Sequence, residues 1–154
     1  MAKIPLSSGF KPIDEGWYTF YIYQVDVDEE FYIIKVHLVT ADGKTHIERF
    51  QLKIDDENWN EAALNIFSYL CKVALNDFDR EEIDDPQELV GHYIKGEIIH
   101  TDVESKKTPG KINVYANLVQ KEVSDGFDEE VSEKAQKIIE KGKAAGASLD
   151  VLLG

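Results

Sequence analysis

The sequence contains few of the residues on which catalytic and metal sites usually depend. Its single cysteine, Cys71, lies in an apolar helical pattern, so we expect a small buried side chain rather than a nucleophile. Phosphate-binding glycine loops, Gly-x-Ser-x-Gly elbows and His-Glu-x-x-His pairs are absent. The histidines lack the paired spacing of a zinc site; they are His37, His46, His92 and His100. We therefore expect no enzyme, no metal and no cofactor.

Long hydrophobic runs are missing as well. No segment approaches the roughly 18 consecutive apolar residues of a membrane-spanning helix, and residues 1–5 lack the apolar core of a signal peptide. The sequence therefore predicts a soluble, cytoplasmic protein without membrane contact. Its 154 residues, 43% of them hydrophobic, are enough for one domain to bury a core without disulfides or metal.

Positive charge is scarce, because 17 Lys and Arg residues face 30 Asp and Glu residues and leave a net charge of −13. Taken alone, this balance argues against nucleic acid as a ligand, since phosphate binding needs cations. The charges are unevenly distributed, however. Residues 14–30 carry six acids and no base and residues 55–88 eleven acids and two bases, whereas residues 31–54 and 89–121 each have a net charge of +2. Screening over roughly 8 Å allows these last two segments to present a basic surface on an acidic protein.

The clearest structural pattern is a β-hairpin over residues 31–54. Two alternating apolar runs flank a turn at residues 41–44, in which Asp42-Gly43 tolerates the positive φ of a tight connection. The alternation predicts one core face, formed by Ile34, Val36, Leu38, Phe50, Leu52 and Ile54. The opposite face then carries a basic strip of Lys35, His37, Arg49 and Lys53.

A strand rich in aromatic residues precedes the hairpin at residues 16–27. Aromatic side chains point to both of its faces, with Tyr21 and Tyr23 on the same one. Two interpretations remain open. The tyrosines pack as ordinary half-buried residues, or they form a platform on which nucleic-acid bases stack.

A helix follows the hairpin. Asp55 or Asp56 is suited to cap its N-terminus, and its apolar stripe predicts that it runs to about Leu75 and packs on the sheet. The stripe consists of Trp59, Ala63, Ile66, Leu70 and Val73. The acidic residues 76–88 match a calcium loop only in part, because Glu82 stands where such a loop needs glycine, so we expect a solvated connection.

Two further strands are expected at residues 89–100 and 111–119. Gly96 permits a bulge or a sharp coiling of the strand, which closing a barrel requires. The loop between the strands contributes three lysines, Lys106, Lys107 and Lys111. Such lysines serve solubility or, beside a basic sheet face, clamp phosphates, and both interpretations stay open.

The composition changes from Ser124 onward. Residues 128–143 predict a helix supported by i,i+4 pairs of Glu and Lys, with a thin apolar stripe of Val131, Ala135 and Ile138. We expect so thin a stripe to leave the helix semi-detached. The apolar end at residues 148–154 either docks back on its own domain or binds another protein or subunit.

Five strands with a helix between the third and the fourth have the order of the OB-fold, a five-stranded Greek-key barrel. The sequence therefore predicts a mainly β (α+β) protein, with an OB-fold domain over residues 1–121 and an added C-terminal helix and tail over residues 122–154. In this fold, the face of strands two and three binds oligonucleotides or oligosaccharides, together with the loops that join strands one to two and four to five.

Five short motifs are spread over about residues 10–120: Glu15-Gly16-Trp17-Tyr18, Asp42-Gly43-Lys44, Asn58-Trp59, Glu88-Leu89-Val90-Gly91 and Asn113-Val114-Tyr115. Together they resemble a family of phage and prophage replication-module proteins, which are taken to be OB-fold single-stranded DNA-binding proteins. The resemblance implies binding of single-stranded DNA. Because members of that family accompany recombinases and helicases, it also implies such partners for the C-terminal tail.

The expected function is that of a non-catalytic protein that coats single-stranded DNA in phage or prophage replication or recombination. The basic contact residues would be Lys35, His37, Arg49, Lys53, Lys106, Lys107 and Lys111. The residues that stack on bases would be Tyr21, Tyr23, Phe31 and Tyr115. The alternative is an OB-fold adaptor that binds a protein through its C-terminal helix and contacts no nucleic acid. Formation of a homo-oligomer is left open.

Overall fold

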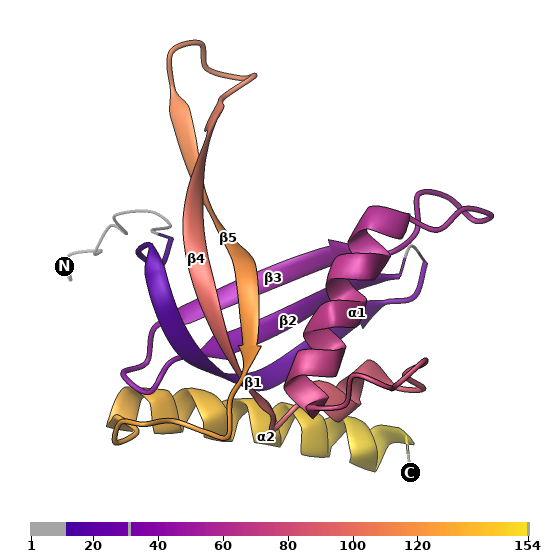
Figure 1. The fold of residues 1–154 in the computed structure, drawn as a ribbon, viewed down its shortest axis with the longest axis vertical. Coiled ribbons are helices and arrows are strands. Elements are labelled where there is room, and N and C mark those ends of the chain that lie inside the picture. Colours follow the sequence, from indigo (N-terminus) through magenta and orange to yellow (C-terminus); the bar gives the residue numbers. More distant parts are fainter. Residues whose placement is uncertain (1–11, 31, 154) are drawn as a thin grey trace, which may run out of the picture.

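The computed structural model describes residues 12–30 and 32–153, with residues 145–153 described by their backbone alone. The elements in chain order are β1 (Gly16–Asp28), β2 (Ile33–Val39), β3 (Thr45–Gln51), α1 (Glu61–Leu75), the short 3₁₀ helix η1 (Pro86–Leu89), β4 (Tyr93–Glu104), β5 (Ile112–Val123) and α2 (Glu133–Leu153). Figure 1 shows a curved sheet with α1 on one side and α2 beneath it. The expected five strands, with a helix between the third and the fourth, are confirmed.

All five strands form one antiparallel sheet in the order β3-β2-β1-β4-β5. The long central strand β1 pairs with β4 through its first half and with β2 through its second half, and its pairing with β2 shifts register at Tyr23. Such a bulge bends a strand and increases its twist. Because β3 and β5 are the two ends of the strand order, the sheet is open and does not close into the expected barrel.

The hairpin of β2 and β3 forms as its alternation predicts. Its arms pair in register from Ile33 with Gln51 to Val39 with Thr45. The turn is held by hydrogen bonds that the Thr40 amide donates to the Lys44 carbonyl and the Gly43 amide donates to the Thr40 carbonyl. Gly43 has a φ of 91°, which a residue with a side chain would adopt only with strain.

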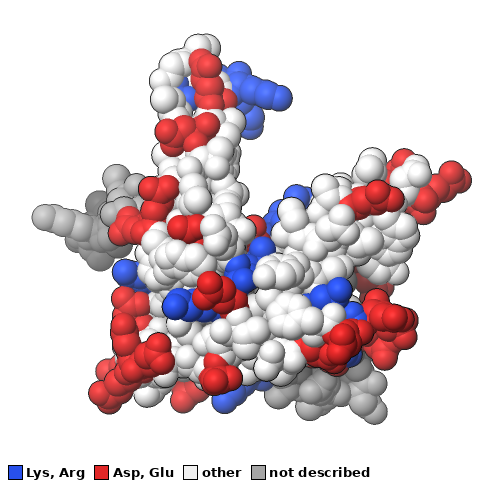
Figure 2. Space-filling model, in the orientation of Figure 1, with Lys and Arg blue, Asp and Glu red and all other residues white. Residues whose placement is uncertain are grey.

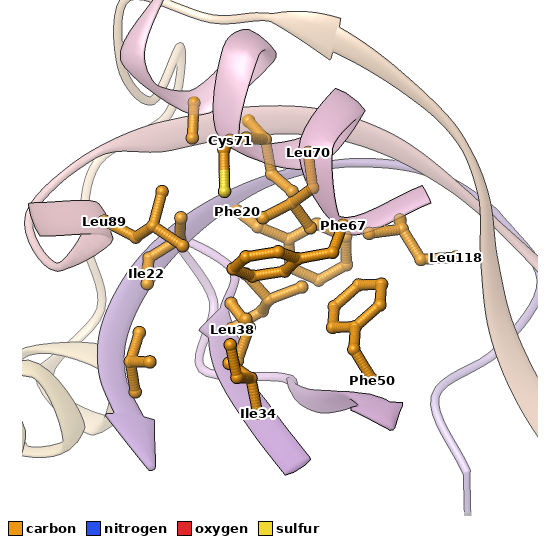
Figure 3. Close-up of a cluster of buried hydrophobic side chains, with 14 of the residues drawn as sticks. Phe20, Ile22, Ile34, Leu38, Phe50, Phe67, Leu70, Cys71, Leu89 and Leu118 are labelled. Carbon is orange, nitrogen blue, oxygen red and sulfur yellow. The ribbon is translucent and has the colours of Figure 1, made fainter. Parts of the chain in front are cut away.

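The main core lies between the inner face of the sheet and α1 (Figure 3). Phe50 of β3 meets Phe67 of α1 edge to face, with ring centroids 5.3 Å apart. The hairpin contributes Ile34, Val36, Leu38, Phe50 and Leu52, as expected, and Cys71 is buried among them. Ile54 was expected in this core but is 63% exposed, because it lies beyond the end of β3.

Helix α1 ends at Leu75 as predicted but begins later than predicted. Its N-cap is Asn60, whose side-chain oxygen accepts a hydrogen bond from the Ala63 amide at 3.2 Å. Asp55 instead closes a separate turn, because its carboxylate accepts hydrogen bonds from the amides of residues 57 and 58. The later start leaves Trp59 outside the helix and exposed. Ile66 of the predicted stripe is exposed as well, and the buried residues of the helix are Phe67, Leu70, Cys71, Val73 and Ala74.

Strand β4 has the predicted length but begins and ends four residues later than predicted, and β5 is longer than predicted. Together they form an arm that rises from the body (Figure 1). Residues 86–88, expected in the solvated connection, and Leu89, expected to begin the strand, form η1 instead. Gly96 is buried against Leu118 so closely that a side chain would not fit, and the pairing shifts register next to it, between Glu97 and Ile98. The bulge expected near Gly96 is therefore present.

Helix α2 packs across the outer face of β1 and β2. Ala135 is fully buried with Tyr21 and Val39, and Val131 and Ile138 are packed against this second cluster. Gly142 lies directly on the backbone carbonyl of Tyr23. The expected semi-detached helix is therefore wrong for this part of α2, and its apolar tip falls among residues whose side chains the structure does not describe.

Within the described ranges, none of the helices combines the length and the apolar character that crossing a membrane would require.

Candidate nucleic-acid interface

The outer face of β2 and β3 carries two neighbouring cations. Lys35 on β2 pairs directly with Arg49 on β3, and both side chains are exposed. On the other side of Lys35, the paired residue of β1 is Asp26. The row across the three strands is therefore one carboxylate followed by two cations, which is a small basic surface with an acidic border.

His37 lies one row further along the same face, but it is engaged within the protein. Its Nε2 atom is 2.7 Å from Oδ2 of Asp26, and its ring stands edge-on to Tyr23 at 5.7 Å between centroids. Burial alone would raise the pKa of Asp26, yet hydrogen bonds from Gln24 and His37 hold this pKa below its ordinary value. His37 is placed on the expected face, but its interaction with Asp26 competes with any phosphate.

Lys53 lies at the far end of this face between two aromatic rings. Its Nζ atom is 4.7 Å from the centroid of Tyr32 and 4.8 Å from the centroid of Trp59, and the two rings are 5.7 Å apart. Tyr32 is 41% and Trp59 48% exposed. Exposed aromatic rings beside a cation have the composition of a base-stacking site. We call Tyr32, Lys53 and Trp59 the aromatic-cation cluster.

The sequence patterns assigned the two rings of the aromatic-cation cluster to other roles. The alternation of β2 put Tyr32 on the core side of the hairpin, and the helical spacing put Trp59 in the apolar stripe of α1. Tyr32 instead has a φ of 48°, which takes it out of the strand, and Trp59 precedes the N-cap and forms an isolated bridge with Lys53. The density of capping residues between 55 and 60 was the one available signal that Trp59 precedes the helix.

The tyrosines of β1 are not placed as a stacking platform. Tyr21 is 8% exposed beneath α2 and packs edge-on against Tyr93 at 5.1 Å between centroids. Burial raises the pKa of its hydroxyl. Tyr23 is half-buried beside the same helix, and burial followed by the charge of Asp26 raises its pKa. The interpretation of these two residues as packing residues therefore fits the structure, and Phe31 lies outside the described residues.

The remaining expected contacts are on the arm. Lys106, Lys107 and Lys111 are exposed around its tip, where the Ser105 amide donates a hydrogen bond to the Lys111 carbonyl. Tyr115 is 52% exposed on the shaft of the arm. Figure 2 shows blue side chains at the tip beside red ones, with further red side chains along the shaft. The structure thus separates these lysines from the cations of β2 and β3, and their contact with DNA stays a prediction.

A partly buried carboxylate joins the two open edges of the sheet. Oε2 of Glu48 on β3 lies 2.6 Å from Nε2 of His46 and accepts a hydrogen bond from the Leu118 amide of β5 at 3.3 Å. Lys121 is buried nearby, and this burial lowers its pKa while the charge of Glu48 opposes the shift. The Glu48 carboxylate therefore has partners within the protein and bridges β3 to β5 at the point where a barrel would close.

The described part of the chain contains no group of three or more His, Cys, Asp and Glu side chains arranged to hold a metal ion. Comparison of the chain with models of protein families and with curated protein sequences found no match. The functional argument therefore depends on the geometry of the outer face and of the surfaces around it.

Proposed function

We propose that this chain is a non-catalytic OB-type protein that binds single-stranded DNA in phage or prophage replication or recombination. Two features of the fold support the OB assignment. The strand order β3-β2-β1-β4-β5 places β3 and β5 at the two edges that meet when an OB barrel closes, and Glu48 already links these edges. Helix α1 lies between β3 and β4 in the chain, as in that fold.

The observation that carries the proposal is the aromatic-cation cluster at the end of the basic face. Arg49 and Lys53 are four residues apart, which corresponds to roughly 13 Å along an extended strand. A nucleic-acid strand that follows β3 would meet Lys35 and Arg49 with its phosphates, and Lys53 further along. Tyr32 and Trp59 would then stack on its bases, an interaction that tolerates any sequence.

The expected affinity is modest and depends strongly on salt. Three cations on single-stranded DNA give a slope of log affinity against log salt of about −2. Asp26 beside Lys35 and the overall charge of −13 weaken binding further. Such a protein coats DNA effectively only at high local concentration, and this role implies a cytoplasmic location.

The test is fluorescence anisotropy of a labelled oligo-dT, with duplex DNA of the same length as a control, at two salt concentrations. We expect preference for the single strand and a loss of at least about tenfold in affinity for the double variant Lys35→Glu with Arg49→Glu. The matched control is Lys137→Glu with Lys141→Glu, which makes the same charge change on the exposed side of α2. Absence of binding at low salt by a chain that is folded by circular dichroism would refute the proposal.

The alternative proposal, an adaptor that binds a recombinase, a helicase or another replication protein through its C-terminal helix, has less surface available. The apolar residues of α2 that the structure describes, among them Ala135 and Ile138, face the protein's own β1 and β2. A partner would have to use residues 145–153.

A further inference from the structure

A deep apolar groove lies between α1 and the connection that follows it. Its volume is about 670 Å³, within the range of ligand and peptide pockets. Its apolar lining comes from the buried side of α1, from the connection and from the hairpin with the turn that follows it, and includes Phe67, Cys71, Leu75, Phe78 and Ile83. The two rings of the aromatic-cation cluster also line it. Phe78 is 51% exposed at its margin. The groove therefore presents apolar surface that the protein itself does not cover.

The connection gives this groove an acidic rim. Asp79, Glu81, Glu82 and Asp84 line it. In the described part of the chain, none of these four carboxylates takes part in an ion pair. Arg80 lies among them, but its guanidinium is bound by both carboxylate oxygens of Glu88, at 2.7 and 2.9 Å. Lys72 is the other cation of the lining, so the rim has a marked excess of negative charge. Red side chains cluster at the lower right of the molecule in Figure 2, on the side of α1 and the connection.

The tip of the arm has the complementary properties. Lys106, Lys107 and Lys111 lie within six residues, and no ion pair joins any of them to a described side chain. Ile112 follows directly and is 61% exposed. The strand pair that carries the tip extends well beyond the body of the sheet (Figure 1). Isolated two-stranded ribbons are marginally stable in water, so a binding surface for the tip would stabilise the arm.

We infer that the tip of the arm of one molecule docks in the acidic groove of a second copy of the same chain. The three lysines lie against the rim carboxylates, and Ile112 enters the apolar groove. The groove of the same molecule is not the acceptor, because no residue of the arm lines it. Since the two surfaces differ, the contact is heterologous and joins molecules head to tail.

This arrangement suits a protein that covers an extended ligand, although the inference does not depend on DNA binding. Head-to-tail contacts repeat along a row of molecules, and a bound strand would raise their local concentration. The contact is expected to be weak in free solution because its ionic part is exposed to solvent and salt.

The test is sedimentation velocity of the full chain without DNA, at low and high salt, up to about 1 mM protein, a range that includes weak transient contacts. We expect association at low salt that decreases at high salt. The tip variant Lys106→Glu, Lys107→Glu, Lys111→Glu and the rim variant Asp79→Lys, Glu81→Lys, Glu82→Lys should each associate at least tenfold more weakly. The control is Lys137→Glu, Lys141→Glu, Lys143→Glu on exposed positions of α2, which should associate like the wild type.

The decisive experiment combines the tip and rim substitutions in one chain. This chain has an acidic tip and a basic rim, so the complementarity is restored with opposite sign and association should return. A wild-type chain that stays monomeric throughout would overturn the inference and leave the groove to a different protein. Failure of the combined chain to associate, with its fold intact by circular dichroism, would overturn it as well.

The same variants separate this inference from the proposed function. Anisotropy with a short oligo-dT that one molecule can cover measures DNA binding without association. Lys35→Glu with Arg49→Glu is expected to lose this binding and to retain association, so loss of one property without the other distinguishes the two proposals. A tip variant that loses binding of the short oligonucleotide, while wild-type chains do not associate, would assign the arm to phosphates and refute the docking.

Discussion

Two neighbouring parts of the same sheet face differ in exposure: one is covered by a helix and the other is open to solvent. Over β1, the outer face is covered by α2, which buries Tyr21 and packs against Tyr23. Over β3 and over the part of β2 that α2 does not reach, the outer face stays open and carries Lys35 and Arg49. The difference follows from side-chain chemistry, because burying apolar surface stabilises the folded state whereas burying an unpaired cation destabilises it. A helix added to an open sheet therefore covers the apolar part and leaves the charged part exposed.

The covered part can be tested where the helix lies closest to β1. Gly142→Ala adds a methyl group against the Tyr23 carbonyl and should lower the free energy of unfolding by about 3 kcal/mol, the upper end of overpacking effects, because the obstacle is backbone. The measurement is urea denaturation. If α2 were not docked, the same change would stabilise the helix by up to about 1 kcal/mol, so the sign of the effect decides. The exposed Ala144→Gly on the same helix serves as the control for propensity.

The contrast between open and covered aromatics gives the second prediction. Trp59→Ala should weaken binding of oligo-dT by about 2 kcal/mol, or about 30-fold, because it removes an exposed stacking surface. Tyr21→Leu, which removes the ring but keeps an apolar side chain, should leave the affinity unchanged, since α2 covers that ring. Anisotropy titrations of both variants give the comparison. Equal effects of the two substitutions would show that α2 leaves β1 when DNA binds.

The inner side of the sheet differs from both outer parts, and Cys71 reports on it. Burial raises the pKa of its thiol to about 12, so the folded state holds this proton more tightly than the unfolded state does. The stabilising effect is complete below the unfolded pKa of about 8.5 and is lost as the pH rises toward 12. Between those pH values, the free energy of unfolding of the wild type should decrease by about 1.4 kcal/mol per pH unit relative to that of Cys71→Ala. Urea denaturation of both chains at pH 8 and pH 10 measures this slope, and parallel curves would contradict it.

The smallest effect is expected at the border between the two outer parts. Asp26→Asn removes the carboxylate beside Lys35 and frees His37, and should raise the affinity for oligo-dT about threefold, as for a partly exposed ion pair. The gain should decrease with added salt. It should also decrease in the background of Lys35→Glu with Arg49→Glu, which removes the two cations in the same row as Asp26.

Local patterns were sufficient for much of the fold. The hairpin of β2 and β3, its turn and its inward-facing residues follow from alternation with a period of two, because successive side chains point to opposite sides of a strand. The end of α1 at Leu75 follows from the helical stripe. The start of α1 was predicted too early because several residues between 55 and 60 are able to cap a helix, and Asp55 uses that ability in a separate turn.

The candidate site was only partly predictable. Lys35 and Arg49 lie on the expected face, since strand alternation determines that face. The contribution of Tyr32 and Trp59 was missed, because both lie just outside regular elements, where periodicity carries no information. Tyr21 and Tyr23 were expected as stacking residues because the period of a strand cannot tell which of two aromatic faces another element will cover.

The sequence by itself determined the local conformation of the chain: where the strands lie, which side chains share a strand face, and how the acidic and basic segments alternate. Only the tertiary structure decided which of these surfaces remain accessible. The cover of α2 on β1, the meeting of Lys53 with two rings, and the groove beside α1 all join residues that are not neighbours in a strand or helix. Their formation depends on packing between elements, whose free energy comes from surfaces brought together by the fold rather than from the order of residues along one element.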